Sequence, residues 1–124
     1  MTENLVAIEG RSIFFCPAGE ALLRGAQAAV DLIGEARSNR AEMVVVPAER
    51  LDPNFFQLRS GVPGEFLQKF VTYQVPVVIL GDISGFAAQS KALRDFIRES
   101  NERDAIWFLQ SVEELRSRIN TARS

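Results

Sequence analysis

The chain of 124 residues has the length of one ordinary domain, and its 47% hydrophobic and 24% charged residues are typical of a globular fold. Its formal net charge is −2 and no block of like charge occurs, which argues against nucleic acid or an anionic membrane as a partner. The absence of histidine and the single cysteine exclude Ser-His-Asp and Cys-His catalysis, His-bearing zinc motifs, iron–sulfur ligation within one chain and an internal disulfide.

The apolar segments also bear on where the protein works. The longest apolar runs, such as VPVVIL, are far too short to cross a bilayer. The opening residues MTENLVAIEGR lack the basic start and long apolar core of a signal peptide. Together with the single cysteine, these features predict a cytoplasmic protein.

The first half of the chain begins with a predicted hairpin. Two short strands, Leu5–Ile8 and Ser12–Cys16, flank Gly10, which supplies the positive φ of a tight connection. Apolar residues at helical spacing then predict a helix from about Ala21 to Arg37. The β-branched run MVVVP, residues Met43–Pro47, predicts a strand covered on both faces.

A turn and a second helix follow this strand. Asp52-Pro53 carries a helix-start signal, and we predict a short turn there that is broken near Ser60-Gly61. A helix from about Val62 to Tyr73 and a buried strand, Val75–Leu80, come next. Pro76 lies near the beginning of that strand, where a missing amide donor does least harm.

The last third of the chain repeats the alternation. A helix over about Ala88–Asn101 leads to the strand Ala105–Leu109, and Ser111 with Glu114 forms the capping box of a final helix. The order β-β-α-β-α-β-α-β-α predicts a single α/β domain over residues 1–124 with about four helices. Its sheet is expected to be mixed, with the N-terminal hairpin and three final parallel strands joined by right-handed crossovers.

The segment GEFLQKFVTYQVPVVILGDIS, followed by ALRDFIRESN, resembles the domain-of-unknown-function 4180 family, which is mostly bacterial. The similarity extends through DLIGEA (Asp31–Ala36) and DPNFFQLRSG, so it covers most of the chain. The family brings no established activity. The resemblance therefore implies a fold and little biochemistry.

The segment around Ser60 resembles a second family, the sulfate transporter and anti-sigma antagonist (STAS) domain. In STAS domains a D-S/T-S-G turn begins a helix, and a partner kinase phosphorylates the serine before the glycine. Ser60-Gly61 matches that pair, whereas Leu58 and Arg59 replace the acidic residue and the Ser/Thr that precede it. The resemblance implies a regulatory binding module with Ser60 as candidate phosphoacceptor beside Arg59. A serine at this position can equally serve as a helix cap without any function.

The loop Gly81-Asp82-Ile83-Ser84-Gly85 is a candidate ligand site. It follows a predicted parallel strand, at the edge of an α/β sheet where ligands usually bind, and helix-start amides there could hold an anion. The loop lacks the lysine of a P-loop, and Asp82 would repel an anion. A turn with a helix cap explains Asp82 and Ser84 at least as well.

Charged residues of the predicted helices supply the remaining candidates. Lys91 with Asp95, and Asp95 with Arg98, have the spacing of ordinary surface pairs. Arg94 or Arg98 could instead bind a carboxylate or phosphate of a partner.

The remaining positions offer no complete constellation. Glu65 and Lys69 have the spacing of a helical pair, and Glu65 is a further candidate for partner contact. Cys16, inside the apolar IFFCP, is predicted to be a buried and unreactive thiol. We predict no catalytic residue, metal site or cofactor.

The expected function is therefore a non-catalytic, STAS-like regulatory module that binds a protein partner. Its working surface would combine the Ser60-Gly61 turn, the helix start VPGE and the Gly81–Ser84 loop, which requires the two turns to lie on one rim. A first alternative is a small-anion or nucleotide-binding protein, or a weak enzyme, that uses the Gly81–Ser84 loop with Asp82 and the arginines of the third helix. A second alternative is a self-assembling structural subunit. A homo-oligomer is compatible with the regulatory module as well as with this subunit.

Overall fold

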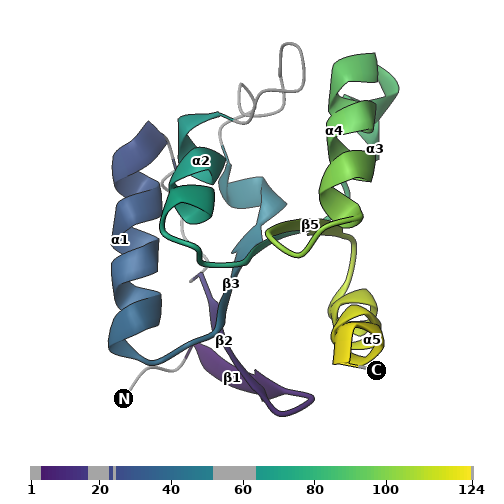
Figure 1. The fold of residues 1–124 in the computed structure, drawn as a ribbon. Helices are drawn as coiled ribbons and strands as arrows, with labels where there is room; N and C mark the ends of the chain where they lie inside the picture. The colour runs from purple at the N-terminus through teal and green to yellow at the C-terminus, as the bar shows by residue number, and fades with distance from the viewer. Residues whose placement is uncertain (1–3, 17–22, 24, 52–63, 124) are drawn as a thin grey trace.

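The computed structural model describes residues 4–16, 23, 25–51 and 64–123, and Figure 1 shows their arrangement. Five strands form one sheet in the order β1-β2-β3-β4-β5. These strands are β1 (Leu5–Ile8), β2 (Arg11–Phe15), β3 (Met43–Pro47), β4 (Val77–Leu80) and β5 (Ile106–Leu109). β1 is antiparallel to β2, and every later pair is parallel. The predicted mixed α/β sheet is confirmed, with four parallel strands where three were expected.

In these described ranges, five α-helices and one 3₁₀ turn accompany the strands, and the last helix follows the final strand. They are α1 (Gly25–Ser38), the 3₁₀ turn η1 (Ala48–Arg50), α2 (Glu65–Thr72), α3 (Ser84–Ala88), α4 (Lys91–Asn101) and α5 (Val112–Arg123). The predicted helix Ala21–Arg37 begins only at Gly25, and Leu23 instead forms an isolated bridge with Leu51. The predicted turn from Asp52 to Gly61 lies outside the described residues. No helix in the described ranges combines the length and apolarity needed to cross a membrane.

The hairpin forms as its sequence predicts. Ile8 pairs with Arg11, which leaves Glu9 and Gly10 as a two-residue connection. Both have positive φ, 49° for Glu9 and 81° for Gly10, as a type I′ turn requires. Gly10 therefore helps to form the tight turn after which β2 runs back beside β1.

The predicted helix Ala88–Asn101 is present as α4, which begins three residues later at Lys91, and the short helix α3 before it was not predicted. The hydroxyl of Ser90 accepts a hydrogen bond from the N–H of Leu93 at 3.1 Å and so caps a new helix, α4. The guanidinium of Arg94 donates to the carbonyl oxygens of Ala87, at 2.8 Å, and Ala88, at 3.3 Å, at the end of α3. These bonds satisfy backbone groups on both sides of the break, so the chain can change direction there.

The helices divide between the two faces of the sheet. Each parallel connection moves one position in the same direction, so crossovers of a single hand place their helices on one face. Side chains of α1, α2 and α4 accordingly pack with Phe14, Val44 and Val77 in one core cluster. Leu115 and Ile119 of α5 pack on the other face, in a second cluster. β3 is buried on both faces, with Met43–Val46 at most 1% exposed.

Candidate functional site

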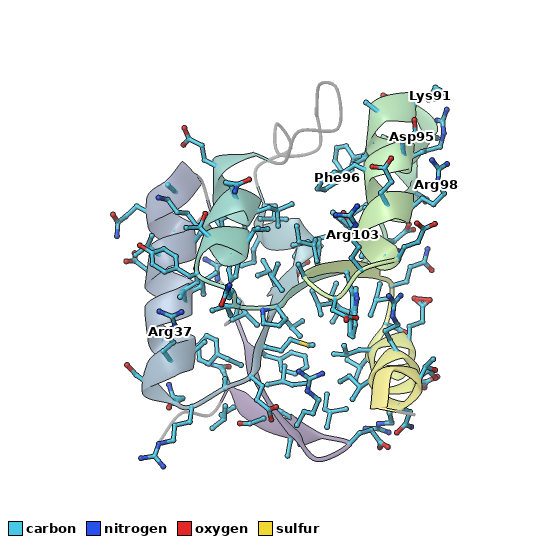
Figure 2. All side chains as sticks on the ribbon, in the orientation of Figure 1. Arg37, Lys91, Asp95, Phe96, Arg98 and Arg103 are labelled. Atoms are coloured by element: carbon cyan, nitrogen blue, oxygen red, sulfur yellow. The ribbon has the colours of Figure 1, made fainter. Side chains whose placement is uncertain are left out.

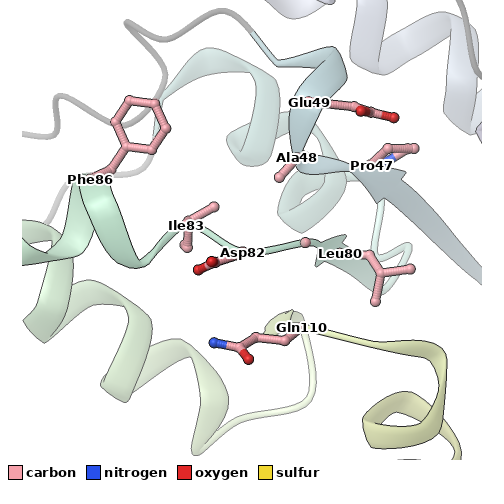
Figure 3. A pocket seen from close by; sticks show the side chains of 9 residues that line it. Pro47, Ala48, Glu49, Leu80, Asp82, Ile83, Phe86 and Gln110 are labelled. Carbon is pink, nitrogen blue, oxygen red and sulfur yellow. The ribbon is translucent and has the colours of Figure 1, made fainter.

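The carboxyl ends of β3, β4 and β5 meet at one edge of the sheet, and a hollow of about 540 Å³ lies there. We call it the carboxyl-edge hollow, and Figure 3 shows its side chains. Its lining residues are Pro47, Ala48, Glu49, Leu80, Gly81, Asp82, Ile83, Phe86 and Gln110. The strand order has no reversal, so the crevice of a topological switch point does not arise. The hollow instead lies between the turn after β3, the loop after β4 and the end of β5.

Gly81 brings the loop after β4 close to the turn after β3. Its φ is 142°, a value that residues with a side chain rarely adopt, and its N–H donates to the carbonyl of Leu109 at 2.9 Å. A Cβ at this position would lie 3.1 Å from the Cβ of Ala48. Both the backbone angle and the close approach therefore require glycine here.

Gly81→Ala is expected to lower the free energy of unfolding by about 1–3 kcal/mol, the usual cost of a residue held in a sparsely populated backbone region. Gly85→Ala is the matched control, because nothing lies within 4 Å of the added Cβ and the residue is helical. It should leave stability unchanged or raise it by up to about 1 kcal/mol. Urea denaturation of both variants makes the comparison, and equal stabilities would contradict this account of Gly81.

Asp82 and Ser84 form a local turn that leads into α3. The Ser84 N–H donates to Asp82 Oδ1 at 2.9 Å, as in an Asx-turn. This bond, and a second from the Ser84 hydroxyl, lower the pKa of Asp82, so its carboxyl is charged at neutral pH. The exposed carboxylate thus has a structural role, and it also gives the carboxyl-edge hollow a fixed negative charge.

The charge of the carboxyl-edge hollow decides which ligands suit it. Glu49 and Asp82 contribute carboxylates and Gln110 an amide, and none of the described lining residues is a lysine or arginine. An anion entering there would meet like charge, with no compensating cation among the described lining residues. The described lining therefore suits a cation better than the small anion or nucleotide that the loop sequence suggested.

The arginines predicted as anion ligands do not line this hollow. Arg94 caps the end of α3, as described above, and Arg98 lies 3.4 Å from Asp95 on the outer side of α4. The Lys91–Asp95 pair is also present at 2.9 Å, and this hydrogen bond is the main reason that the pKa of Asp95 is lowered. Figure 2 shows Phe96 on one side of α4 and Lys91 and Arg98 on the opposite side. The predicted surface pairs are confirmed.

Other candidate residues fall in different places. Arg59, Ser60 and Gly61 lie outside the described residues, so their position relative to the Gly81–Ser84 loop stays a prediction. Glu65 is exposed in the first turn of α2, beside the beginning of α1 at Gly25, and does not line the carboxyl-edge hollow.

Cys16 is buried, as its sequence context predicted. It is 5% exposed, and Arg50 Nη1 lies 3.5 Å from its sulfur. Burial raises the pKa of the thiol, and this effect outweighs the opposing charge of Arg50. A thiol held protonated in this way is a poor nucleophile.

The sequence analysis missed the polar and aromatic lining residues outside the Gly81–Gly85 loop, which are Glu49, Phe86 and Gln110. Glu49 comes two residues after the predicted strand Met43–Pro47, and Gln110 directly follows the predicted strand Ala105–Leu109. Because parallel strands end at a common edge, polar residues just after each predicted strand could have been grouped in advance. Phe86 carries no such signal, since its exposure depends on where α3 begins.

These features define a small single-domain α/β protein with an acidic and partly apolar hollow at the carboxyl edge of its parallel strands. The family model described as Domain of unknown function (DUF4180) matches residues 8–119, and the chain belongs to this family. The resemblance read from the motifs is thereby confirmed. No curated protein and no solved structure matches the chain significantly. The likeness to STAS domains stays a prediction.

Proposed function

We propose that this protein is a non-catalytic, STAS-like regulatory module of the bacterial cytoplasm that binds a protein partner. The carboxyl-edge hollow would receive a lysine or arginine side chain from that partner. One observation carries the proposal, which is that the same hollow combines two carboxylates with an exposed aromatic ring.

The chemistry of the hollow fits a side chain that is apolar along its stem and cationic at its tip. Phe86 is 42% exposed at the rim, and Ile83 and Pro47 add aliphatic surface. Lysine and arginine bury their methylene stems on such surface, and their charged heads are attracted to aromatic faces. The carboxylates of Glu49 and Asp82 supply the opposite charge. A basic residue of a protein partner satisfies all of these groups together.

The regulatory part of the proposal rests on the sequence. Ser60 precedes α2 in the position of the STAS phosphoacceptor, and phosphorylation would add a charge of about −1.5 to −2 at pH 7. We expect an added charge of this size to change the affinity for a partner that presents a basic side chain. The Ser60→Asp and Ser60→Ala variants isolate the effect of charge in the binding assay below.

Phe86→Ala is expected to weaken partner binding by about 30-fold, because a central aromatic anchor commonly contributes 2 kcal/mol or more. Glu49→Gln should weaken it less and should reduce its dependence on salt. The partner would be captured from native-host lysate on immobilised protein, identified, purified and titrated against each variant by calorimetry. Val112→Ala is the matched control, since Val112 is 40% exposed on α5 and lies outside the hollow.

Unchanged affinity for both Phe86→Ala and Glu49→Gln would place the partner elsewhere and overturn the role of the hollow. Failure to capture any specific partner across growth conditions would count against the binding module itself. A thermal-shift panel of nucleotides, phosphates and carboxylates tests the rival function. A ligand at 100 times its Kd adds about 2.7 kcal/mol, which is a readable shift for a domain of this size.

A further inference from the structure

The two edge strands of the sheet, β1 and β5, differ in whether their outward backbone groups have hydrogen-bond partners. At the β5 edge, the Phe108 N–H donates to Asn101 Oδ1 at 2.7 Å, and Asn101 Nδ2 donates to the Phe108 carbonyl at 3.2 Å. The side-chain amide of Asn101 thus takes the place of a neighbouring strand at Phe108. Backbone groups bonded in this way cannot pair with another chain.

The β1 edge directs backbone groups outward. The Phe15 N–H donates to the Asn4 carbonyl at 2.8 Å, so residues 4 and 15 form a hydrogen-bonded pair of the antiparallel ladder. Such pairs alternate with pairs whose groups point away from each other, and Ala7–Ser12 is one of the latter. The Ser12 carbonyl accordingly accepts from the N–H of Glu42, next to β3. The N–H and C=O of Ala7 therefore point away from the sheet.

By the same alternation the backbone groups of Leu5, opposite Phe14, also point outward. Within the described ranges, no hydrogen-bond partner of these outward groups is present for either Leu5 or Ala7. The strand sequence LVAI contains no charge or proline to discourage pairing, and Val6 is 40% exposed. β1 is a short, neutral and unprotected edge.

We propose that β1 pairs with β1 of a second copy of this chain, antiparallel about a two-fold axis at Val6. This register sets Leu5 of each copy opposite Ala7 of the other, and their outward groups form four backbone hydrogen bonds. The two five-stranded sheets become one continuous sheet of ten strands. The inference is independent of the carboxyl-edge hollow, because no residue of β1 lines it.

A second copy fits this edge because the edge is self-complementary. The outward groups lie at positions symmetric about Val6, as an isologous contact requires. Every facing pair over residues 4–8 is uncharged, so two copies with a net charge of −2 bring no like charges into opposition there. The two Val6 side chains face each other across the axis as a β-branched pair. Only one short strand takes part, so the dimer belongs to the weak class of interfaces, with a Kd on the order of 100 μM.

Sedimentation equilibrium from about 10 μM to about 1 mM brackets such a Kd and should show a reversible dimer. Val6→Lys and Val6→Glu should each be monomeric, because each places like charges directly opposite across the axis. An equimolar mixture of the two should dimerise again. Val112→Lys is the matched control, since Val112 is equally exposed on α5 and its substitution should leave the dimer intact.

Ala7→Pro and amide hydrogen exchange provide a second test. Proline removes only the outward N–H, so the hairpin bonds of β1 remain while edge pairing is lost. In the unmodified protein, exchange at the amides of Leu5 and Ala7 should slow as concentration rises. A wild-type chain that stays monomeric to about 1 mM would overturn the proposal. So would a dimer that survives both Val6→Lys and Ala7→Pro.

Discussion

Leu115→Ala is expected to lower the free energy of unfolding by about 3 kcal/mol, within the range of 2–5 kcal/mol measured for buried leucines. α5 is the single described helix on its face of the sheet, and Leu115 and Ile119 are both fully buried. They pack in one cluster with Val78 and Trp107. No second helix on that face is described that could move in to fill the space left by the leucine.

Val112→Ala provides the comparison for this prediction, because Val112 belongs to the same helix and is 40% exposed. It should cost less than about 1 kcal/mol, as exposed positions usually do. Urea unfolding followed by circular dichroism and by Trp107 fluorescence measures both variants. Equal losses would mean that α5 does not hold this face of the sheet. If Leu115→Ala lowers the stability measured by Trp107 fluorescence but leaves the circular-dichroism midpoint unchanged, α5 detaches before the rest of the domain unfolds.

The fold could be predicted from sequence where one short-range pattern determines the structure. The continuous run Met43–Val46 predicts a strand buried on both faces, and each of these residues is at most 1% exposed. Gly10 marks the hairpin for an equally local reason, its positive φ. The capping box is also present, since Ser111 Oγ accepts from the Glu114 N–H at 3.2 Å. Glu114 in turn accepts from the N–H of Gln110, one residue earlier than the usual capping box.

The parts that could not be predicted depend on contacts between residues of different elements. Helical periodicity does not show that α4 begins at Lys91 and not at Ala88, because Ser90 is tolerated inside a helix until its hydroxyl caps Leu93. The pairing of β2 with β3 depends on the path of α1 across the sheet. The sequence alone does not distinguish a sheet in which β2 pairs with β3 from one in which the β1–β2 hairpin lies apart from the parallel strands.

The candidate site shows the same division. Gly81 and Asp82 were predicted, because they follow a recognisable strand and carry turn chemistry. Arg94 and Arg98 were grouped with them because of their charge. In the structure Arg94 bonds the end of α3 and Arg98 pairs with Asp95. Charge alone does not fix the direction of a long side chain, so the sequence could not show whether these arginines line the hollow.

Asn101→Ala is the second large effect that we expect, a loss of about 2–4 kcal/mol. The substitution removes two hydrogen bonds from the backbone of Phe108, in a partly buried position. A buried donor or acceptor left without a partner costs about 1–3 kcal/mol, and solvent at the edge recovers part of this. Glu102→Ala is the control, because Glu102 is the exposed next residue and should change stability by less than about 0.5 kcal/mol. Thermal and urea unfolding measure the difference.

Asn101→Ala should also change how the protein associates, because it opens the β5 edge. Pairing through β1 alone is isologous and closes as a dimer, whereas a chain with two open edges can add copies without limit. Sedimentation velocity should therefore show species larger than a dimer for Asn101→Ala. Adding Val6→Lys to this variant closes the β1 edge and should return the limit to a dimer. If Asn101→Ala loses stability without forming larger species, the Asn101 amide stabilises Phe108 but does not guard the edge.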